Sequence, residues 1–185
     1  AGALSLDLNG LGASGFSRFS AITKGNIALA GDLALHAGGQ LRLGAAGDLT
    51  WGGNLSMSGG SVTAAAFNHL QVGDGVHMDL AGRWHNDSAA VNPTRDPQGR
   101  PDAKLNTRGG SVGLYANQLE LGTGVNLDVS GGGWLGAAGS LSAGDAGSIV
   151  LQATTQSDSL DGSLRLGEQL QLSAYGLKKG GALTL

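Results

Sequence analysis

A glycine recurs every six to eight residues between positions 25 and 60, and an apolar–x–apolar triplet follows each one after a small or polar residue. Three consecutive steps of this pattern span 21 or 22 residues. Apolar residues at every second position are typical of a short β-strand with one buried face. Connections this short exclude the crossovers of a dozen or more residues that parallel neighbours in an open sheet need. The spacing therefore predicts a coil of three short strands per turn, in which each strand pairs with the strand one turn later.

A longer repeat continues the same order through the rest of the chain. The sequence LQVGDGVHMDLAG at 70–82 recurs as LELGTGVNLDVSG at 119–131, and more weakly at 164–176. Each copy encodes two strands joined by a tight corner, and a third short strand precedes each copy. We therefore expect an all-β parallel β-helix in which residues 1–185 form a single segment, with its most regular part at about 22–82.

Insertions interrupt the repeat mainly at one corner. Residues 83–109 hold all three prolines and eight charged residues, and residues 131–146 form a second, glycine-rich insertion. A third, polar insertion at 153–162 lies at another corner. Corner insertions in solenoids are common binding sites, so we expect 83–109 to project from the coil. Limited proteolysis should cut this insertion near Arg95 or Arg100 while the remainder stays folded. The candidate binding residues are Trp84, His85, Arg95, Arg100 and Trp134. For Trp134 we favour a ring that folds back to cap its loop over a free contact, whereas for Trp84 the two interpretations are balanced.

Composition excludes several classes of protein. Glycine makes up 35 of the 185 residues, and each glycine inside a helix costs about 1 kcal/mol relative to alanine. The chain has no cysteine, which excludes a disulfide framework. A net charge of −3 without a basic run disfavours nucleic-acid binding. No apolar run approaches the roughly 20 residues of a membrane span, so we expect no membrane insertion.

Two aspartates raise the alternative of an enzyme. Asp79 and Asp128 occupy equivalent positions in successive long repeats. On adjacent strands they would lie about 5 Å apart, which is near the carboxylate separation of retaining glycosidases. An outward aspartate near a strand end more commonly keeps that edge soluble, and the third repeat has Ser173 at this position. We therefore predict that the chain is not an enzyme and keep a polysaccharide-active β-helix enzyme as the alternative.

The sequence contains no convincing metal or cofactor motif. Asp74 and Asp145 lie in isolated glycine-rich turns that lack the tandem nonapeptide period of calcium-binding β-helices. The four histidines, His36, His69, His77 and His85, form no i, i+4 pair and have no cysteine partner. We therefore expect no bound metal and no cofactor.

The pattern also resembles a known family. Residues 15–35 (GFSRFSAITKGNIALAGDLAL), 127–134 (LDVSGGGW) and 147–151 (GSIVL) resemble filamentous-haemagglutinin-like exoproteins of Gram-negative bacteria. The resemblance implies a long right-handed β-helical shaft, exported by two-partner secretion through an outer-membrane transporter. It also implies a secreted or cell-surface location. Adhesion, haemolysis and contact-dependent toxin delivery are the roles that the family suggests.

These observations lead to one expected function. We expect a structural and adhesive shaft segment, a monomeric fibre that presents its corner loops to a host-cell glycan or protein receptor. The stalk of a contact-dependent toxin delivery protein is a further alternative. The chain starts directly in patterned sequence and stops within an apparent strand, so we expect it to be a segment of a longer protein.

Overall fold

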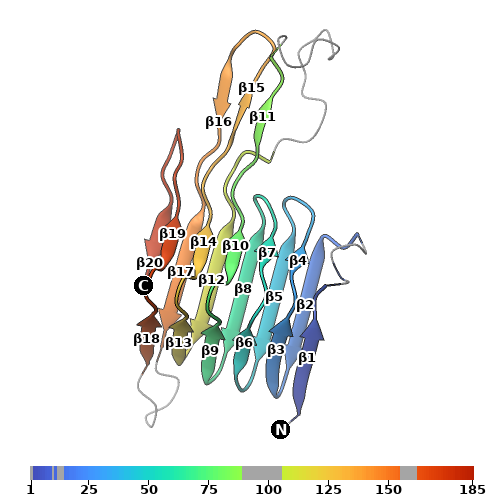
Figure 1. Cartoon of the computed structure of the whole chain (residues 1–185), viewed down its shortest axis with the longest axis vertical. Coiled ribbons are helices and arrows are strands. Elements are labelled where there is room, and N and C mark those ends of the chain that lie inside the picture. The colour runs from blue at the N-terminus through green and yellow to red at the C-terminus, as the bar shows by residue number, and fades with distance from the viewer. Residues whose placement is uncertain (1, 10, 12–14, 89–105, 155–161) are drawn as a thin grey trace.

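The computed structural model describes residues 2–9, 11, 15–88, 106–154 and 162–185 of the chain. Twenty β-strands form the regular secondary structure of these residues, and none of them lies in a helix. Within these ranges there is likewise no helix long and apolar enough to cross a membrane. Most strands stand side by side in a stack, from which a smaller group of strands projects (Figure 1). The all-β class predicted from the sequence is confirmed.

Three parallel sheets make up the stack. Sheet A has the order β1 (Ala3–Asp7), β3 (Asn26–Ala30), β6 (Leu49–Trp51), β9 (His69–Val72), β13 (Gln118–Leu121) and β18 (Ser163–Leu166). Sheet B has the order β2 (Arg18–Thr23), β5 (Gln40–Ala45), β8 (Ser61–Ala66), β12 (Ser111–Ala116), β17 (Ser148–Ala153) and β20 (Ala182–Thr184). Sheet C has the order β4 (Leu33–Ala34), β7 (Leu55–Ser56), β10 (His77–Asp79), β14 (Asn126–Asp128) and β19 (Gln171–Ser173).

The chain visits the three sheets in a fixed rotation. In one pass, β8 lies in sheet B, β9 in sheet A and β10 in sheet C, and the next pass repeats this order with β12, β13 and β14. Each strand of the second pass pairs in parallel with its counterpart in the first, for example Leu119 with Leu70 and Leu127 with Met78. The predicted three strands per repeat, each paired with the strand one repeat later, are therefore confirmed. The arrangement is compatible with a β-helix.

Alternation along each strand builds the core between the sheets. Leu119 and Leu121 of β13 are buried, whereas the alternating residues Gln118 and Glu120 reach the outer surface. In-register pairing places like residues above one another, so that Leu49, Leu70 and Leu119 form one buried column of sheet A. The core is therefore one continuous, mostly aliphatic column extended by each pass, as expected for a solenoid with mainly nearest-neighbour contacts.

Side chains and glycines hold successive passes together at the corners. Between sheets A and C, the Asn9 Oδ1 atom accepts from the Asp32 backbone N–H at 3.0 Å, and Asp32 Oδ1 accepts from Asn54 N–H at 2.8 Å. The turn before β10 contains Gly75 in the left-handed region at a φ of +66°, and Gly124 takes that position in the next pass. In the third long repeat Gln169 adopts this conformation at a φ of 55°. A non-glycine residue thus occupies a glycine turn where the sequence repeat is weakest.

Candidate binding surface

The two main insertions combine into one small sheet outside the stack. This satellite sheet contains β11 (Trp84–Asn86), β15 (Gly133–Leu135) and β16 (Leu141–Ala143). Strand β11 pairs in parallel with β15, and β15 pairs antiparallel with β16. All three strands lie in segments that connect sheet C to sheet B, at the corner predicted for both insertions. They project beyond the stack (Figure 1). The sequence places both insertions at one corner, and the structure pairs them in a single sheet.

A buried aspartate joins the two insertions. The side chain of Asp87 has an exposed fraction of 0%. Its Oδ2 atom accepts a hydrogen bond of 2.8 Å from Trp134 Nε1, and its Oδ1 atom lies 3.0 Å from Nε2 of His85. Charge-assisted hydrogen bonds in a desolvated site are the stronger class. The hydrogen bond from Trp134 therefore ties β15 to the residue directly after β11, whereas the contact between His85 and Asp87 lies within one insertion.

Trp84 takes the opposite role, because its side chain is 62% exposed. It pairs with Gly133, and a Cβ atom built on Gly133 would lie 2.7, 3.1 and 3.1 Å from three consecutive atoms of the indole six-membered ring. These near-equal distances belong to a point above the ring plane, since an approach along the ring edge would leave the two outer atoms distinctly farther away. One face of the indole therefore rests on the glycine backbone, while the side chain remains largely open to solvent.

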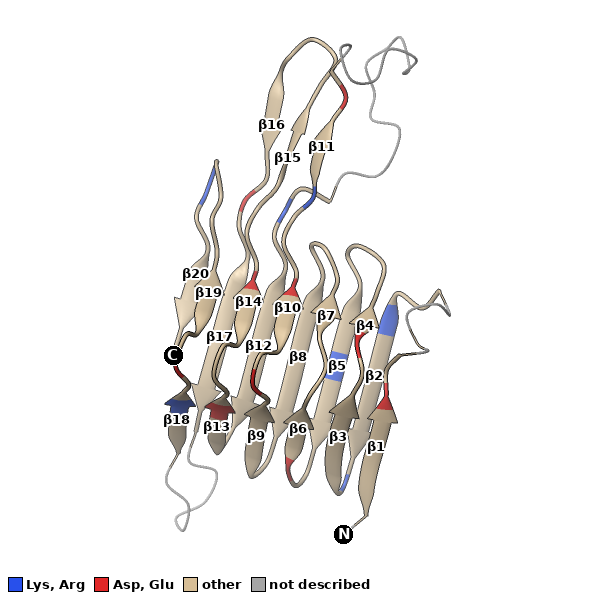
Figure 2. Ribbon diagram, viewed as in Figure 1, with Lys and Arg blue, Asp and Glu red and all other residues tan. Residues whose placement is uncertain are grey.

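The neck of the satellite sheet carries exposed polar and aromatic groups. Arg83 precedes β11 directly, and its backbone N–H donates to the Asn106 carbonyl oxygen at 2.7 Å. Tyr175, which lies on the next pass and is 78% exposed, accepts at its carbonyl oxygen from the Gly131 N–H at 2.6 Å. Figure 2 shows charged segments near this neck, while the strands of the stack carry few. The predicted residues Arg95 and Arg100 lie outside the described residues, as does the predicted cleavage site beside them.

The two equivalent aspartates do lie on neighbouring strands. Asp79 of β10 pairs in register with Asp128 of β14, beside a hollow of about 350 Å³ that His77 and Asn126 also line. One oxygen of each carboxylate accepts from a backbone N–H two residues further on, at Ala81 for Asp79 (3.1 Å) and at Ser130 for Asp128 (2.8 Å). Each side chain thus helps to form its own corner, which is the structural role of an aspartate turn.

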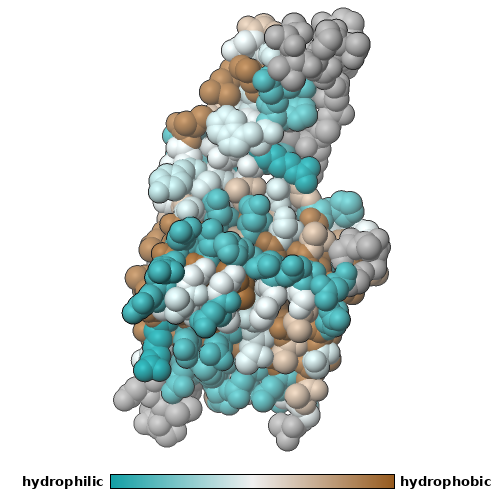
Figure 3. All heavy atoms as spheres, in the orientation of Figure 1, coloured by the Kyte–Doolittle hydropathy of each residue, from teal (hydrophilic) through white to brown (hydrophobic). Residues whose placement is uncertain are grey.

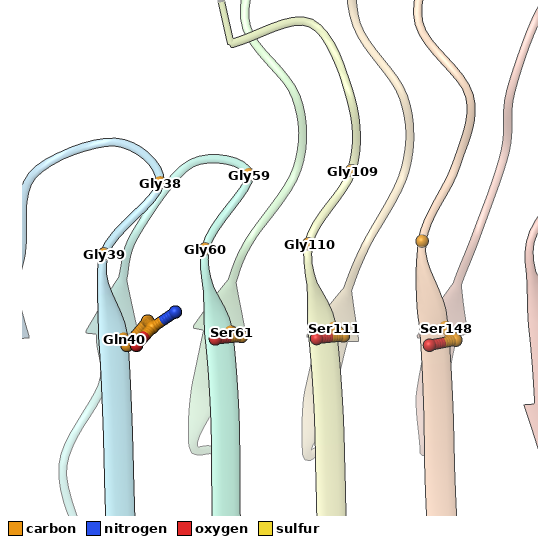
Figure 4. Close-up of a pocket in the computed structure, with 11 residues that line it drawn as sticks. Gly38, Gly39, Gln40, Gly59, Gly60, Ser61, Gly109, Gly110, Ser111 and Ser148 are labelled. Atoms are coloured by element: carbon orange, nitrogen blue, oxygen red, sulfur yellow. The ribbon is translucent and has the colours of Figure 1, made fainter. Parts of the chain in front are cut away.

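A glycine groove crosses four passes at the corner between sheets C and B. It has a volume of about 360 Å³ and is lined by glycine pairs before Gln40, Ser61 and Ser111 and by the single Gly147 before Ser148. Figure 4 shows these four side chains in a row, all pointing to the same side of the strands. The groove is shallow and uncharged, and Gly60, Gly110 and Gly147 are required by the close approach of the previous pass. We therefore treat it as part of the corner packing.

The remaining polar contacts of the stack are isolated pairs. His69 of β9 lies 3.5 Å from Glu120 of β13, with both side chains about one-third exposed. Among the described residues no three metal-ligating side chains gather into a group that could hold an ion. Figure 3 shows hydrophilic residues spread over the visible face of the stack.

The residue that sequence reasoning missed is Asp87, the buried partner of Trp134 and His85. Nothing in the local pattern distinguishes it from the other charged residues of 83–109, because its burial arises from a contact 47 residues away. The satellite sheet, with Trp84 exposed and Asp87 buried, is the feature that stands apart from the regular stack. Comparison with protein-family models, with curated proteins and with solved structures finds no match to this chain.

Proposed function

We propose that this chain is a right-handed parallel β-helical shaft segment of a secreted or surface-exposed filamentous-haemagglutinin-like protein, and that its satellite sheet contacts a host-cell glycan or protein receptor. The three parallel sheets, visited in rotation around one mostly aliphatic core, support the shaft. The sequence resemblance supports the family, the bacterial surface location and export through an outer-membrane transporter. The absence of cysteine fits passage of an unfolded chain through the oxidising periplasm.

The exposed indole of Trp84 is the observation that supports a binding role. Full burial of a large apolar side chain contributes about 1.5–3 kcal/mol, and a chain with only three tryptophans keeps one of them 62% exposed. Tryptophan is enriched among residues that dominate binding energy. Its ring face attracts the partial positive charge of C–H or cationic groups.

The support beneath Trp84 strengthens this argument. Gly133 leaves room for the indole to lie against the backbone, and a side chain at this position would push the ring away. Asp87 then ties β11 to Trp134 across the sheet. A rigid aromatic surface loses little conformational entropy on binding, which suits a contact surface held away from a shaft.

Binding of the purified chain to a broad glycan array and to cultured epithelial cells tests this function. We expect Trp84→Ala to reduce binding at least tenfold while the thermal midpoint of unfolding stays within error. Phe67→Ala is the matched control, because Phe67 is an exposed aromatic residue in the middle of the stack, outside the satellite sheet. Equal binding by wild type and Trp84→Ala would refute the role of the satellite sheet.

A polysaccharide-active enzyme is the second candidate, because two carboxylates lie in register beside a hollow. Polysaccharide cleavage by wild type, measured by the release of reducing ends, is compared with Asp79→Asn and Asp128→Asn. An enzyme that uses the pair would lose activity in both variants. No cleavage by wild type on a broad glycan panel would retire this candidate and leave the shaft proposal unaffected.

A further inference from the structure

Strand β16 forms an open edge of the satellite sheet. The order of that sheet is β11, β15 and β16, and among the described residues no strand pairs with the far side of β16 (Figure 1). The pass that follows β16 is itself part of the structure, and its corner at 174–181 joins the neck. There the Ala146 N–H donates to the Lys179 carbonyl oxygen at 2.9 Å. The described corner of the following pass therefore adds no strand to β16.

The hydrogen bonds between β15 and β16 show which backbone groups face this edge. The Gly136 N–H donates to the Ser140 carbonyl oxygen at 2.8 Å, and Gly144 N–H, four residues further on, donates back across the same ladder at 2.9 Å. Hydrogen-bonded and non-hydrogen-bonded pairs alternate along an antiparallel ladder. Leu141 and Ala143 therefore belong to non-hydrogen-bonded pairs. Their N–H and C=O groups point away from β15, toward the open edge.

The side chains along this edge are apolar or uncharged. Leu141 is 54% exposed and lies directly opposite Leu135 of β15, so both leucines stand on the same face of the sheet. Edge strands are commonly protected from pairing by charged residues, proline or a bulge. Strand β16 has the sequence Leu-Ser-Ala and a regular register, and none of these protections. The edge is therefore apolar and able to accept another strand.

We propose that β16 binds β16 of a second copy of this chain, antiparallel about a two-fold axis at Leu141. In this register the two Leu141 residues exchange a pair of backbone hydrogen bonds, because their N–H and C=O groups face the edge. Ser142 of each copy faces Ser140 of the other. The two three-stranded sheets become one sheet, in which Leu135 and Leu141 of both copies form a single row on one face.

The edge is complementary to itself in this register. A two-fold contact requires the same patch of both copies to meet, and here the exposed Leu141 packs against its own counterpart. Residues 139–143 carry no charge, so no like charges face each other along the paired strands. One short strand from each copy buries less than the roughly 1,200–2,000 Å² of a stable interface. We therefore expect a weak dimer that closes at two copies and joins two shafts through their satellite sheets.

This dimer goes beyond the proposed receptor contact and leaves it open. Trp84 lies on β11, at the opposite edge of the satellite sheet, so pairing through β16 does not cover it. Receptor binding and self-association can therefore fail separately. The dimer differs from the monomeric fibre expected from the sequence.

Sedimentation velocity at protein concentrations up to about 1 mM tests the proposal. We expect wild type to shift from monomer to dimer and to form nothing larger. Leu141→Lys and Leu141→Glu should each raise the dissociation constant at least tenfold, because like charges then meet at the two-fold axis. An equimolar mixture of these two variants should recover the dimer, since Lys then faces Glu. Phe67→Lys introduces a charge at an exposed aromatic residue of the stack and should dimerise as wild type does.

Introduced cysteines test the register, because the chain has none of its own. Ser140 and Ser142 of opposite copies form a non-hydrogen-bonded pair, in which the Cα atoms lie about 4.5 Å apart. That separation is within the range of disulfides, about 4.4–6.8 Å. Under mild oxidation, a mixture of Ser140→Cys and Ser142→Cys should form the mixed disulfide at least tenfold faster than either variant alone forms its own.

Other outcomes overturn the proposal. A wild type that is monomeric throughout the concentration range shows that β16 does not pair with itself. Leu141→Lys that dimerises like wild type shows that another surface associates. A charge mixture that stays monomeric, or equal cross-linking with and without mixing, shows that Leu141 does not lie on the axis. Circular dichroism and the thermal midpoint check folding. If the Leu141 variants are unfolded, Ala143→Pro removes an edge-facing N–H without disturbing the ladder to β15, and it should abolish the dimer.

Discussion

Glycines in this chain serve two separate purposes, and three substitutions by alanine distinguish them. Gly147 begins a pass at the corner before β17, where an added Cβ would overlap the carbonyl oxygen of Gly110 on the previous pass. Gly75 has open space around it but has a φ of +66°. Gly180 has open space and no left-handed φ. Gly147 is thus constrained by lack of space and Gly75 by its backbone conformation, whereas Gly180 is under neither constraint.

The structure ranks the three changes in unfolding free energy. Gly180→Ala should be neutral or stabilise by about 0.4–1 kcal/mol, since alanine reduces the entropy of the unfolded chain. Gly75→Ala gains the same amount but places Cβ in the left-handed region at a cost of about 1–2 kcal/mol, so it loses roughly 1 kcal/mol. Gly147→Ala must separate two passes, which weakens the Ser148 N–H to Gly110 carbonyl hydrogen bond (3.2 Å). Overpacking and that bond together predict a loss of about 2–4 kcal/mol.

Urea unfolding, monitored by tryptophan fluorescence, measures these changes in unfolding free energy. An unchanged slope of the unfolding free energy against urea concentration shows that the unfolded reference state is the same. The informative comparison is between Gly147 and Gly75. If Gly147→Ala costs no more than Gly75→Ala, neighbouring passes do not pack against each other at this corner. The registers of sheets B and C would then need revision.

Three further predictions concern the core, a strained corner and the satellite sheet. Leu127→Ala, at a fully buried position of β14, should lower the unfolding free energy by about 2–5 kcal/mol in urea unfolding, and a loss below 1 kcal/mol would contradict a packed core. Gln169→Gly should raise the thermal midpoint, because a residue at a φ of 55° gains about 1 kcal/mol by becoming glycine; a lower midpoint would show that the side chain stabilises the turn. Trp134→Phe removes the donor to buried Asp87 and should cost about 1–3 kcal/mol locally. Hydrogen exchange should then speed up in β11, β15 and β16 but not in β13, and equal acceleration in both would refute a separate satellite sheet.

The regular part of the fold is accessible from the sequence because its determinants are local. The apolar–x–apolar triplets specify which face of each strand is buried, and the glycine spacing specifies how soon the chain turns. The pairing of Leu70 with Leu119 follows from the repeat itself, since equivalent residues of successive passes are neighbours. The reason why each glycine is needed is harder to predict from the sequence. Only seven described glycines have a left-handed φ, and others, such as Gly60 and Gly110, are required by contact with the neighbouring pass.

The candidate site is less accessible because its determinants are not local. Trp84 and Trp134 could be singled out as residues that open insertions, but nothing in the sequence shows that one is exposed and the other bound to Asp87. That difference depends on the pairing of β11 with β15, two short strands with no repeat between them. A sequence pattern can indicate where insertions interrupt the repeat of a solenoid. The contacts between two insertions can be seen only in the structure.

The neck of the satellite sheet explains how the shaft carries an insertion without losing its register. Asp79 and Asp128 remain paired immediately before the insertions, and Ser111 and Ser148 are paired immediately after them. At the neck, the Gly132 N–H donates to the Thr107 carbonyl oxygen at 2.7 Å. Because the chain leaves and returns at nearly the same point, loop closure depends only weakly on the length inserted. Residues beyond the neck can therefore change with little effect on the stack, whereas Gly132, whose Cβ would overlap the Arg83 carbonyl oxygen, cannot. Variation that alters binding should thus concentrate in the outer part of the satellite sheet.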